Sequence, residues 1–169
     1  MDEGQVIETS TVAGRLVVFR YPRRSDLSQF IVMRQSFHEE RIMASHEKTD
    51  ELKGRSRLDD ILAAMAAERA RWLFVELDGK LVGQGSAAIY SDTYVAVGVS
   101  LMREARGMGL GKKMMLLVED EARKLKRDTL YLHVWSTNPV ARTLYKDLGY
   151  EEIARRRISS DWTPGSMRT

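Results

Sequence analysis

Residues 101–115, LMREARGMGLGKKMM, carry three glycines at alternate positions between a strand-like segment and a helix-like segment. Gly107, Gly109 and Gly111 let the backbone turn tightly and leave its amides unshielded by side chains. A helix N-terminus has unpaired N–H groups and the positive end of the helix dipole, so it attracts phosphate oxygens. The stretch therefore predicts a strand, a phosphate-binding turn and a helix.

Three interpretations of this glycine turn compete. A Walker loop ends in Gly-Lys-Ser/Thr, but here Gly111-Lys112 is followed by Lys113, which has no hydroxyl for magnesium. A Rossmann fingerprint needs a different glycine spacing and normally follows the first strand of its domain. A glycine-rich helix entry without a ligand stays open, although Arg106 and the two lysines add positive charge to the turn.

Hydrophobic periodicity on both sides of the turn predicts the remaining elements. Strands are expected at 15–21, 72–77, 81–90, 93–101, 129–135 and 150–158, with an Asp78-Gly79 turn in the first hairpin. Helices are expected after a cap at Ser25 or Asp26, from about 58 to 71, over 109–126, and from Asn138 to Gly149. The order β-α-α-β-β-β-α-β-α-β implies a mixed α/β sheet, antiparallel at first and parallel later.

Domain organisation follows from the absence of repeats and linkers. We expect one domain over 1–169, with a loose tail at 1–13 and a short polar tail at 159–169. The polar stretch 36–56 predicts either a long loop or a poorly packed helix. One compact α/β unit is the expected architecture.

Composition excludes several classes of function. Among the 169 residues there is no cysteine, which excludes a disulfide framework, a thiolate zinc site and a cysteine nucleophile. The net charge of +3 and the scattered basic residues favour an anionic ligand but not nucleic acid. No apolar run is long enough for a membrane span, and the acidic start MDEGQVIETS differs from a signal peptide. These absences together predict a cytoplasmic protein. The three histidines lack metal-ligand spacing, so we expect no metal.

Two motifs resemble those of the GNAT superfamily of N-acetyltransferases. Arg106-x-x-Gly109-x-Gly111 is similar to its R/Q-x-x-G-x-G/A motif, and residues 138–151, NPVARTLYKDLGYE, are similar to its second motif. The element order agrees over about 15–158, while the specific match spans roughly 93–151. The resemblance implies a GNAT-like fold in which antiparallel N-terminal strands precede a β-α-β-α unit with a splayed parallel strand pair, here 93–101 and 129–135.

The resemblance also implies acetyl-CoA as cosubstrate. In this family the loop amides bind the pyrophosphate, and the backbone of the preceding strand binds the pantetheine arm. The corresponding cofactor-binding residues are Val99, Leu101, Met102, Arg103, Arg106, Gly107, Met108, Gly109, Leu110, Gly111, Lys112, Asn138, Ala141 and Tyr145.

Acetyl transfer to an amine needs an oxyanion donor, a general acid and a route for the amine proton. The resemblance implies the Leu101 backbone N–H as oxyanion donor, and Tyr145, two helical turns from Asn138, is the candidate general acid. Simple packing of Tyr145 and simple helix capping by Asn138 stay open. The general base is not identified, with Glu76 and the cluster 38–40 (His-Glu-Glu) as weak candidates.

These features predict an acetyl-CoA-dependent N-acetyltransferase that transfers the acetyl group directly to a primary amine. The acceptor is expected to be a protein N-terminus, a lysine or a small amine. The alternative is a non-catalytic acyl-CoA-binding or regulatory module of the same fold. Family members usually end in a two-stranded hairpin, but only 150–158 read as a strand here, so the unpaired edge predicts a homodimer.

Overall fold

The computed structural model describes residues 2–42 and 48–154, and its strands form one six-stranded sheet in the order β1-β2-β3-β4-β5-β6. The strands are β1 (Val6–Val12), β2 (Arg15–Arg20), β3 (Ala70–Leu77), β4 (Lys80–Ile89), β5 (Tyr94–Leu101) and β6 (Thr129–Tyr131). The helices are α1 (Leu27–Glu39), α2 (Glu51–Ala66), α3 (Leu110–Arg123) and α4 (Pro139–Asp147), with short 3-10 turns η1 (Arg24–Asp26) and η2 (Arg103–Ala105).

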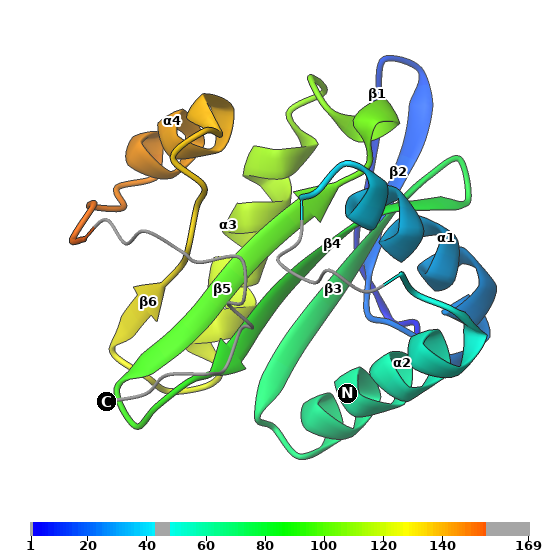
Figure 1. Cartoon of the computed structure of the whole chain (residues 1–169), viewed down its shortest axis with the longest axis horizontal. Coiled ribbons are helices and arrows are strands. Elements are labelled where there is room, and N and C mark those ends of the chain that lie inside the picture. Colours follow the sequence, from blue (N-terminus) through cyan, green and yellow to red (C-terminus); the bar gives the residue numbers. More distant parts are fainter. Residues whose placement is uncertain (1, 43–47, 155–169) are drawn as a thin grey trace.

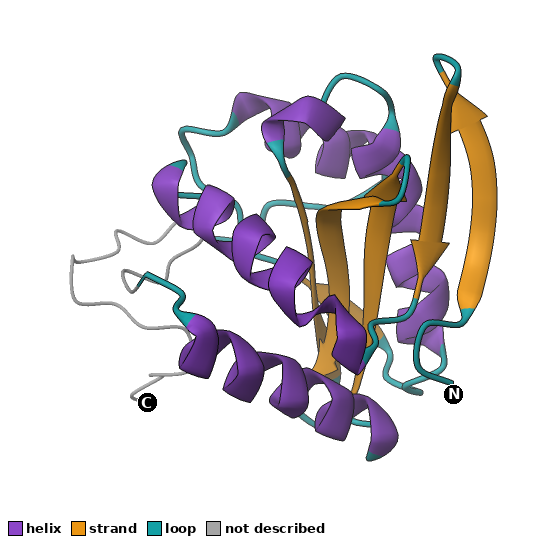
Figure 2. Cartoon of the chain, turned by 90° about the vertical axis from the view of Figure 1, so that its right-hand side faces the viewer, coloured by secondary structure: helices purple, strands orange, loops and turns teal. Residues whose placement is uncertain are grey.

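Helices cover both faces of the sheet, α1 and α2 on one and α3 on the other (Figures 1 and 2). On the first face the ring of Phe74 stacks on Phe30 of α1, with centroids 5.7 Å apart. On the second face Gly85 lies beneath α3, where a Cβ would come within 2.5 Å of Val118 Cγ2. The absence of a side chain at Gly85 therefore allows α3 to pack close to β4.

The sheet is mixed, as the sequence predicts. Strands β1 to β5 pair antiparallel, whereas β5 and β6 pair parallel. The parallel register runs only from Tyr94↔Thr129 to Ala96↔Tyr131, after which β5 continues to Leu101. Beyond β6 the chain leaves the sheet and rises to α4 (Figure 1). The expected splay is thus confirmed, but the expected strand 129–135 is too long, because β6 ends at Tyr131.

The predicted N-terminal tail is wrong. Within 1–13, Val6–Val12 forms β1, which pairs antiparallel with β2. Ala13 and Gly14 join the two strands with φ of +50° and +75°, the left-handed conformation that tight hairpin turns require. A strand of alternating exposed and half-buried residues has little apolar signal, so composition alone suggested a tail.

The polar stretch 36–56 contains the end of α1 and the start of α2. Helix α1 runs on to Glu39, and α2 begins at Glu51, where the Asp50 carboxylate accepts a hydrogen bond from the Lys53 N–H at 2.8 Å. Helix α2 ends at Ala66 rather than near Arg71, which belongs to β3. Residues 43–47 lie outside the described part.

The expected strand 150–158 does not form in its described portion, because residues 151–154 adopt no regular secondary structure. Side chains hold this segment instead: Tyr150 donates to Glu119 of α3 at 3.0 Å, and Arg142 of α4 donates to Glu152 at 3.0 Å. Residues 155–158 and the tail 159–169 lie outside the described ranges. The homodimer that was inferred from this edge stays a prediction.

A buried ion cluster ties β2, η1 and β3 together. The Arg20 guanidinium donates to both Asp26 oxygens, at 2.8 and 2.6 Å, and to Glu76 Oε1, at 2.8 and 2.5 Å. Arg20 and Asp26 are each only 2% exposed. A buried charge without its partner is strongly unfavourable, so the cluster fixes where α1 begins relative to the sheet.

Replacing Asp26 by Ala should therefore destabilise the fold. The change leaves the Arg20 charge buried with one partner fewer, and we expect the free energy of unfolding to fall by about 3–5 kcal/mol. Urea denaturation measures this directly. Asp120→Ala, which removes an exposed carboxylate paired with Arg123, is the control and should cost about 1 kcal/mol or less. Equal losses in the two variants would contradict the role assigned to the cluster.

Candidate active site

The glycine turn has the backbone conformation that the sequence predicts. Gly107 and Gly109 have φ of +72° and +75°, and a Cβ built at either position meets no described atom within 4 Å. Gly109 is the N-cap of α3 and offers no capping side chain, and the first intrahelical bond runs from the Lys113 N–H to its carbonyl at 3.1 Å. The N–H groups of residues 110–112 therefore precede the helical ladder and point out of the helix end.

The end of β5 presents a second row of backbone groups. The Met102 N–H donates to the Val82 carbonyl of β4 at 2.8 Å. Antiparallel pairing alternates along a strand, so the N–H groups of Val97, Val99 and Leu101 point away from β4. They point to the side on which β6 lies, but the β6 register ends at Ala96. This row of amides consequently faces the gap between the two strands.

Helix α4 borders the same gap. A Cβ at Gly111 would lie 3.7 Å from Leu101 Cδ1 and 3.8 Å from Leu144 Cδ2, so Gly111 marks where β5, α3 and α4 meet. Tyr145 is 9% exposed, and its ring packs edge-on against Tyr150 with centroids 5.8 Å apart. Burial raises the pKa of the Tyr145 hydroxyl, which keeps it protonated at neutral pH.

Asn138 caps α4, since its Oδ1 accepts a hydrogen bond from the Ala141 N–H at 3.0 Å. The helix thereby uses both the Asn138 side-chain oxygen and the Ala141 amide. The side-chain nitrogen of Asn138, Nδ2, takes no part in this capping hydrogen bond. A cofactor contact by either residue stays a prediction.

Two of the three basic residues around the turn make contacts within the protein. Arg106 binds the Leu101 carbonyl and donates to Glu40 Oε2 at 2.8 Å. Lys113 pairs with Glu8 of β1 at 2.7 Å. The Lys112 side chain is exposed. The pairing with Glu8 could not be anticipated while 1–13 was expected to be a tail.

The structure places Glu76 away from this gap. It lies on β3, two strands from β5, and Arg20 binds its carboxylate in the buried cluster. The geometry gives it no support as a base. Glu40, from the cluster 38–40, is linked to the glycine turn through Arg106. Within residues 2–42 and 48–154, no group of three or more His, Asp or Glu side chains could hold a metal ion. None of the helices described there is long and apolar enough to cross a membrane.

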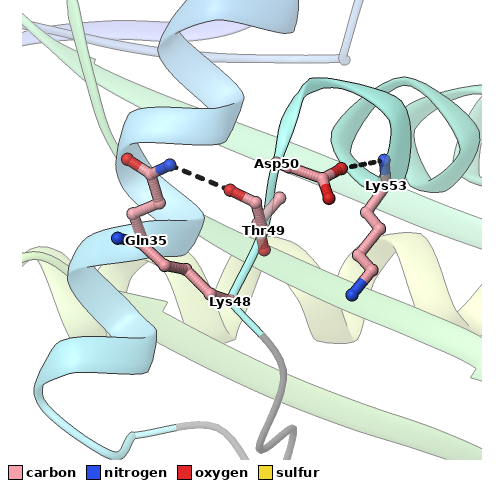
Figure 3. A pocket seen from close by; sticks show the side chains of 5 residues that line it. All are labelled: Gln35, Lys48, Thr49, Asp50 and Lys53. Carbon is pink, nitrogen blue, oxygen red and sulfur yellow. Dashed lines mark hydrogen bonds between the residues drawn. The ribbon is translucent and has the colours of Figure 1, made fainter.

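A separate hollow of about 420 Å³ lies between α1 and the start of α2 (Figure 3). The Gln35 side chain donates to the Thr49 carbonyl at 2.8 Å across it. No residue of the glycine turn, β5 or α4 lines this hollow. Its lining is Gln35, Lys48, Thr49, Asp50 and Lys53.

Solved structures share this fold. The chain superimposes on yncA of Salmonella typhimurium, solved with its cofactor acetyl-CoA, with a TM-score of 0.72 at 19% identity, covering 82% of this chain and 81% of that one. The ribosomal-protein-alanine N-acetyltransferase of Brucella melitensis gives 0.70 at 20% identity, covering 80% and 85%. The glucosamine-6-phosphate N-acetyltransferase of Arabidopsis thaliana gives 0.67 at 17% identity, covering 85% and 97%.

Sequence comparison identifies the family. Comparison with curated proteins found no match. The model of the acetyltransferase (GNAT) family matches residues 32–150, which include the glycine turn, the splayed strands and α4. The chain therefore belongs to the acetyltransferase (GNAT) family, whose acetyl donor is acetyl-CoA.

Proposed function

We propose that this protein is an N-acetyltransferase that transfers the acetyl group of acetyl-CoA directly to a primary amine. The observation that carries the proposal is the convergence of two rows of backbone amides, from the end of β5 and the start of α3, on one gap that Leu144 of α4 borders. The acceptor is a protein N-terminus, a lysine or a small amine. Two structural neighbours act on acceptors as different as a ribosomal-protein alanine and glucosamine-6-phosphate, so the fold alone does not select among them.

We assign each backbone group a part of acetyl-CoA according to its position in the site. The amides of 109–112 and the positive end of α3 would hold the pyrophosphate, while the β5 amides would bind the pantetheine arm. Acetyl-CoA supplies an acyl group that is already activated as a thioester. The Leu101 N–H is suited to stabilise negative charge on the thioester oxygen, because its direction is fixed before the reaction.

Tyr145 would return a proton to the departing sulfur. A group whose pKa is raised above its ordinary value stays protonated over a wider range, so the acid form is present throughout neutral pH. No side chain near the gap is assigned as the base. The amine proton would then leave through water.

Turnover distinguishes an enzyme from a binding module. Incubation with acetyl-CoA and a panel of amines, covering peptide N-termini, lysine derivatives and small amines, should release free thiol in an amine-dependent way. Binding of acetyl-CoA without amine-dependent thiol release by any member of the panel would favour the non-catalytic alternative.

Gly109→Val should abolish acetyl-CoA binding. A β-branched residue is strained at φ +75°, and its side chain would occupy the open space in front of the α3 amides. Isothermal titration should show no measurable affinity. Gly79→Val provides the matched control, since Gly79 has φ +78° and equally open surroundings but lies in the β3–β4 turn. It should lose similar stability and keep its affinity, and a comparable loss of binding in both variants would refute the loop assignment.

Tyr145→Phe should lower kcat by roughly 10²- to 10⁴-fold and leave the acetyl-CoA dissociation constant nearly unchanged. The ring, and with it the packing against Tyr150, is retained. Steady-state kinetics combined with titration separates the two effects. Tyr150→Phe removes the neighbouring hydroxyl, which binds Glu119, and should affect stability rather than kcat. Full activity in the Tyr145 variant would exclude the acid role.

A further inference from the structure

The Arg106 side chain is 41% exposed, yet its guanidinium binds groups of the protein itself. Its Nε and Nη2 donate to the Leu101 carbonyl at 3.0 and 2.9 Å, and its Nη1 donates to Glu40 Oε2 at 2.8 Å. The resemblance to the family motif counts Arg106 among the cofactor-binding residues. The geometry gives its side chain a contact role within the protein, because three of its five N–H groups already donate to acceptors of the chain.

These contacts fix the last peptide of β5. Arg106 holds the carbonyl of the Leu101–Met102 peptide, and the Val82 carbonyl accepts the N–H of the same peptide at 2.8 Å. Just before it, Ser100 is paired with Gln84 in the β4–β5 ladder. Leu101 is therefore held on both sides, and the direction of its own N–H follows from that.

The same side chain closes the turn that leads to α3. It spans from residue 106 back to residue 101, across η2, where the Ala105 N–H donates to the Met102 carbonyl at 3.0 Å. Arg106 is followed directly by Gly107, the first residue of the turn with positive φ. The end of β5 and the glycine turn are consequently joined by one guanidinium.

Glu40 orients that guanidinium. It lies at the C-terminal end of α1, its side chain is only 18% exposed, and Arg103 approaches the same oxygen at 3.7 Å. A carboxylate that accepts from an arginine in a partly buried site makes a stronger and more directional bond than a neutral acceptor. The Arg106–Glu40 pair thus links the glycine turn to the C-terminal end of α1.

We propose that Arg106 is a positioning residue for acetyl transfer and not a phosphate ligand, and that Glu40 holds it in place. This inference rests on the proposed function above. Arg106 aligns the Leu101 N–H with the reacting thioester, which every acetyl donor presents. Its loss therefore affects every acetyl donor, whether or not the donor carries phosphate.

Two acetyl donors distinguish a positioning role of Arg106 from a phosphate-binding role. Acetyl-CoA contains the pyrophosphate, whereas S-acetyl-pantetheine has the same thioester and arm without phosphate. Arg106→Ala should lower kcat/KM for both donors by the same factor, roughly tenfold to a hundredfold, and should lower kcat at saturating acetyl-CoA. A phosphate ligand would give a different result, with KM raised for acetyl-CoA and unchanged kinetics for S-acetyl-pantetheine, which would overturn the proposal.

Conservative variants exclude a merely structural explanation. Arg106→Gln keeps one donor for the Leu101 carbonyl and should recover part of kcat. Glu40→Gln should lower kcat in the native background and add little in the Arg106→Ala background, because the two residues act as a unit. Additive losses, or no recovery with Gln, would contradict the proposal.

Glu104→Gln is the matched control. Glu104 lies in the same turn and pairs with Lys80 without touching Arg106, so its loss should leave both donors' kinetics unchanged. If a thermal melt shows that Arg106→Ala is poorly folded, kcat/KM for the two acetyl donors is compared in Glu40→Gln and Arg106→Gln instead. Failure of the unmodified protein to use either donor would instead refute the proposed function.

Discussion

The parallel pairing of β5 with β6 stops at Ala96, and the site depends on this constraint. Backbone polar groups in a sheet normally have partners, yet among the strands described β5 continues from Ala96 to Leu101 with a strand neighbour on one side only. Antiparallel pairing with β4 continues along this half of β5 up to Leu101. The start of α3 and the helix α4 border the opening. The topology therefore places the backbone donors that we propose for phosphate, pantetheine and thioester, and we propose that the Arg106–Glu40 pair holds the Leu101 N–H among them.

The rest of the fold keeps this arrangement in place. Gly85 lets α3 pack close to the sheet at Met114 and Val118. The Arg20 cluster fixes the start of α1, and Glu40 at the other end of α1 reaches Arg106 beside the opening. Helix α1 thus connects the buried ion cluster to the glycine turn.

Features with a local cause could be predicted from the sequence. The positive φ of Gly107 and Gly109, the cap at Asn138 and the hairpin at Asp78-Gly79 depend on residues within one turn of each other. The strand β1 was missed because its alternating pattern is mostly polar, and the end of β6 because it depends on where the partner strand diverges. The ion pairs of Glu76 and Glu40 bridge 56 and 66 residues, and nothing in the local sequence specifies them.

An amide-resolved NMR titration with acetyl-CoA tests the central claim most directly. The account predicts that the largest shifts fall on the amides of residues 97–101 and 107–112, with little change in the β1–β2 hairpin. Two separate segments should respond together and saturate at the same ligand concentration. Shifts centred on the hollow at Gln35 and Thr49, or a response confined to the glycine turn without β5, would contradict the account.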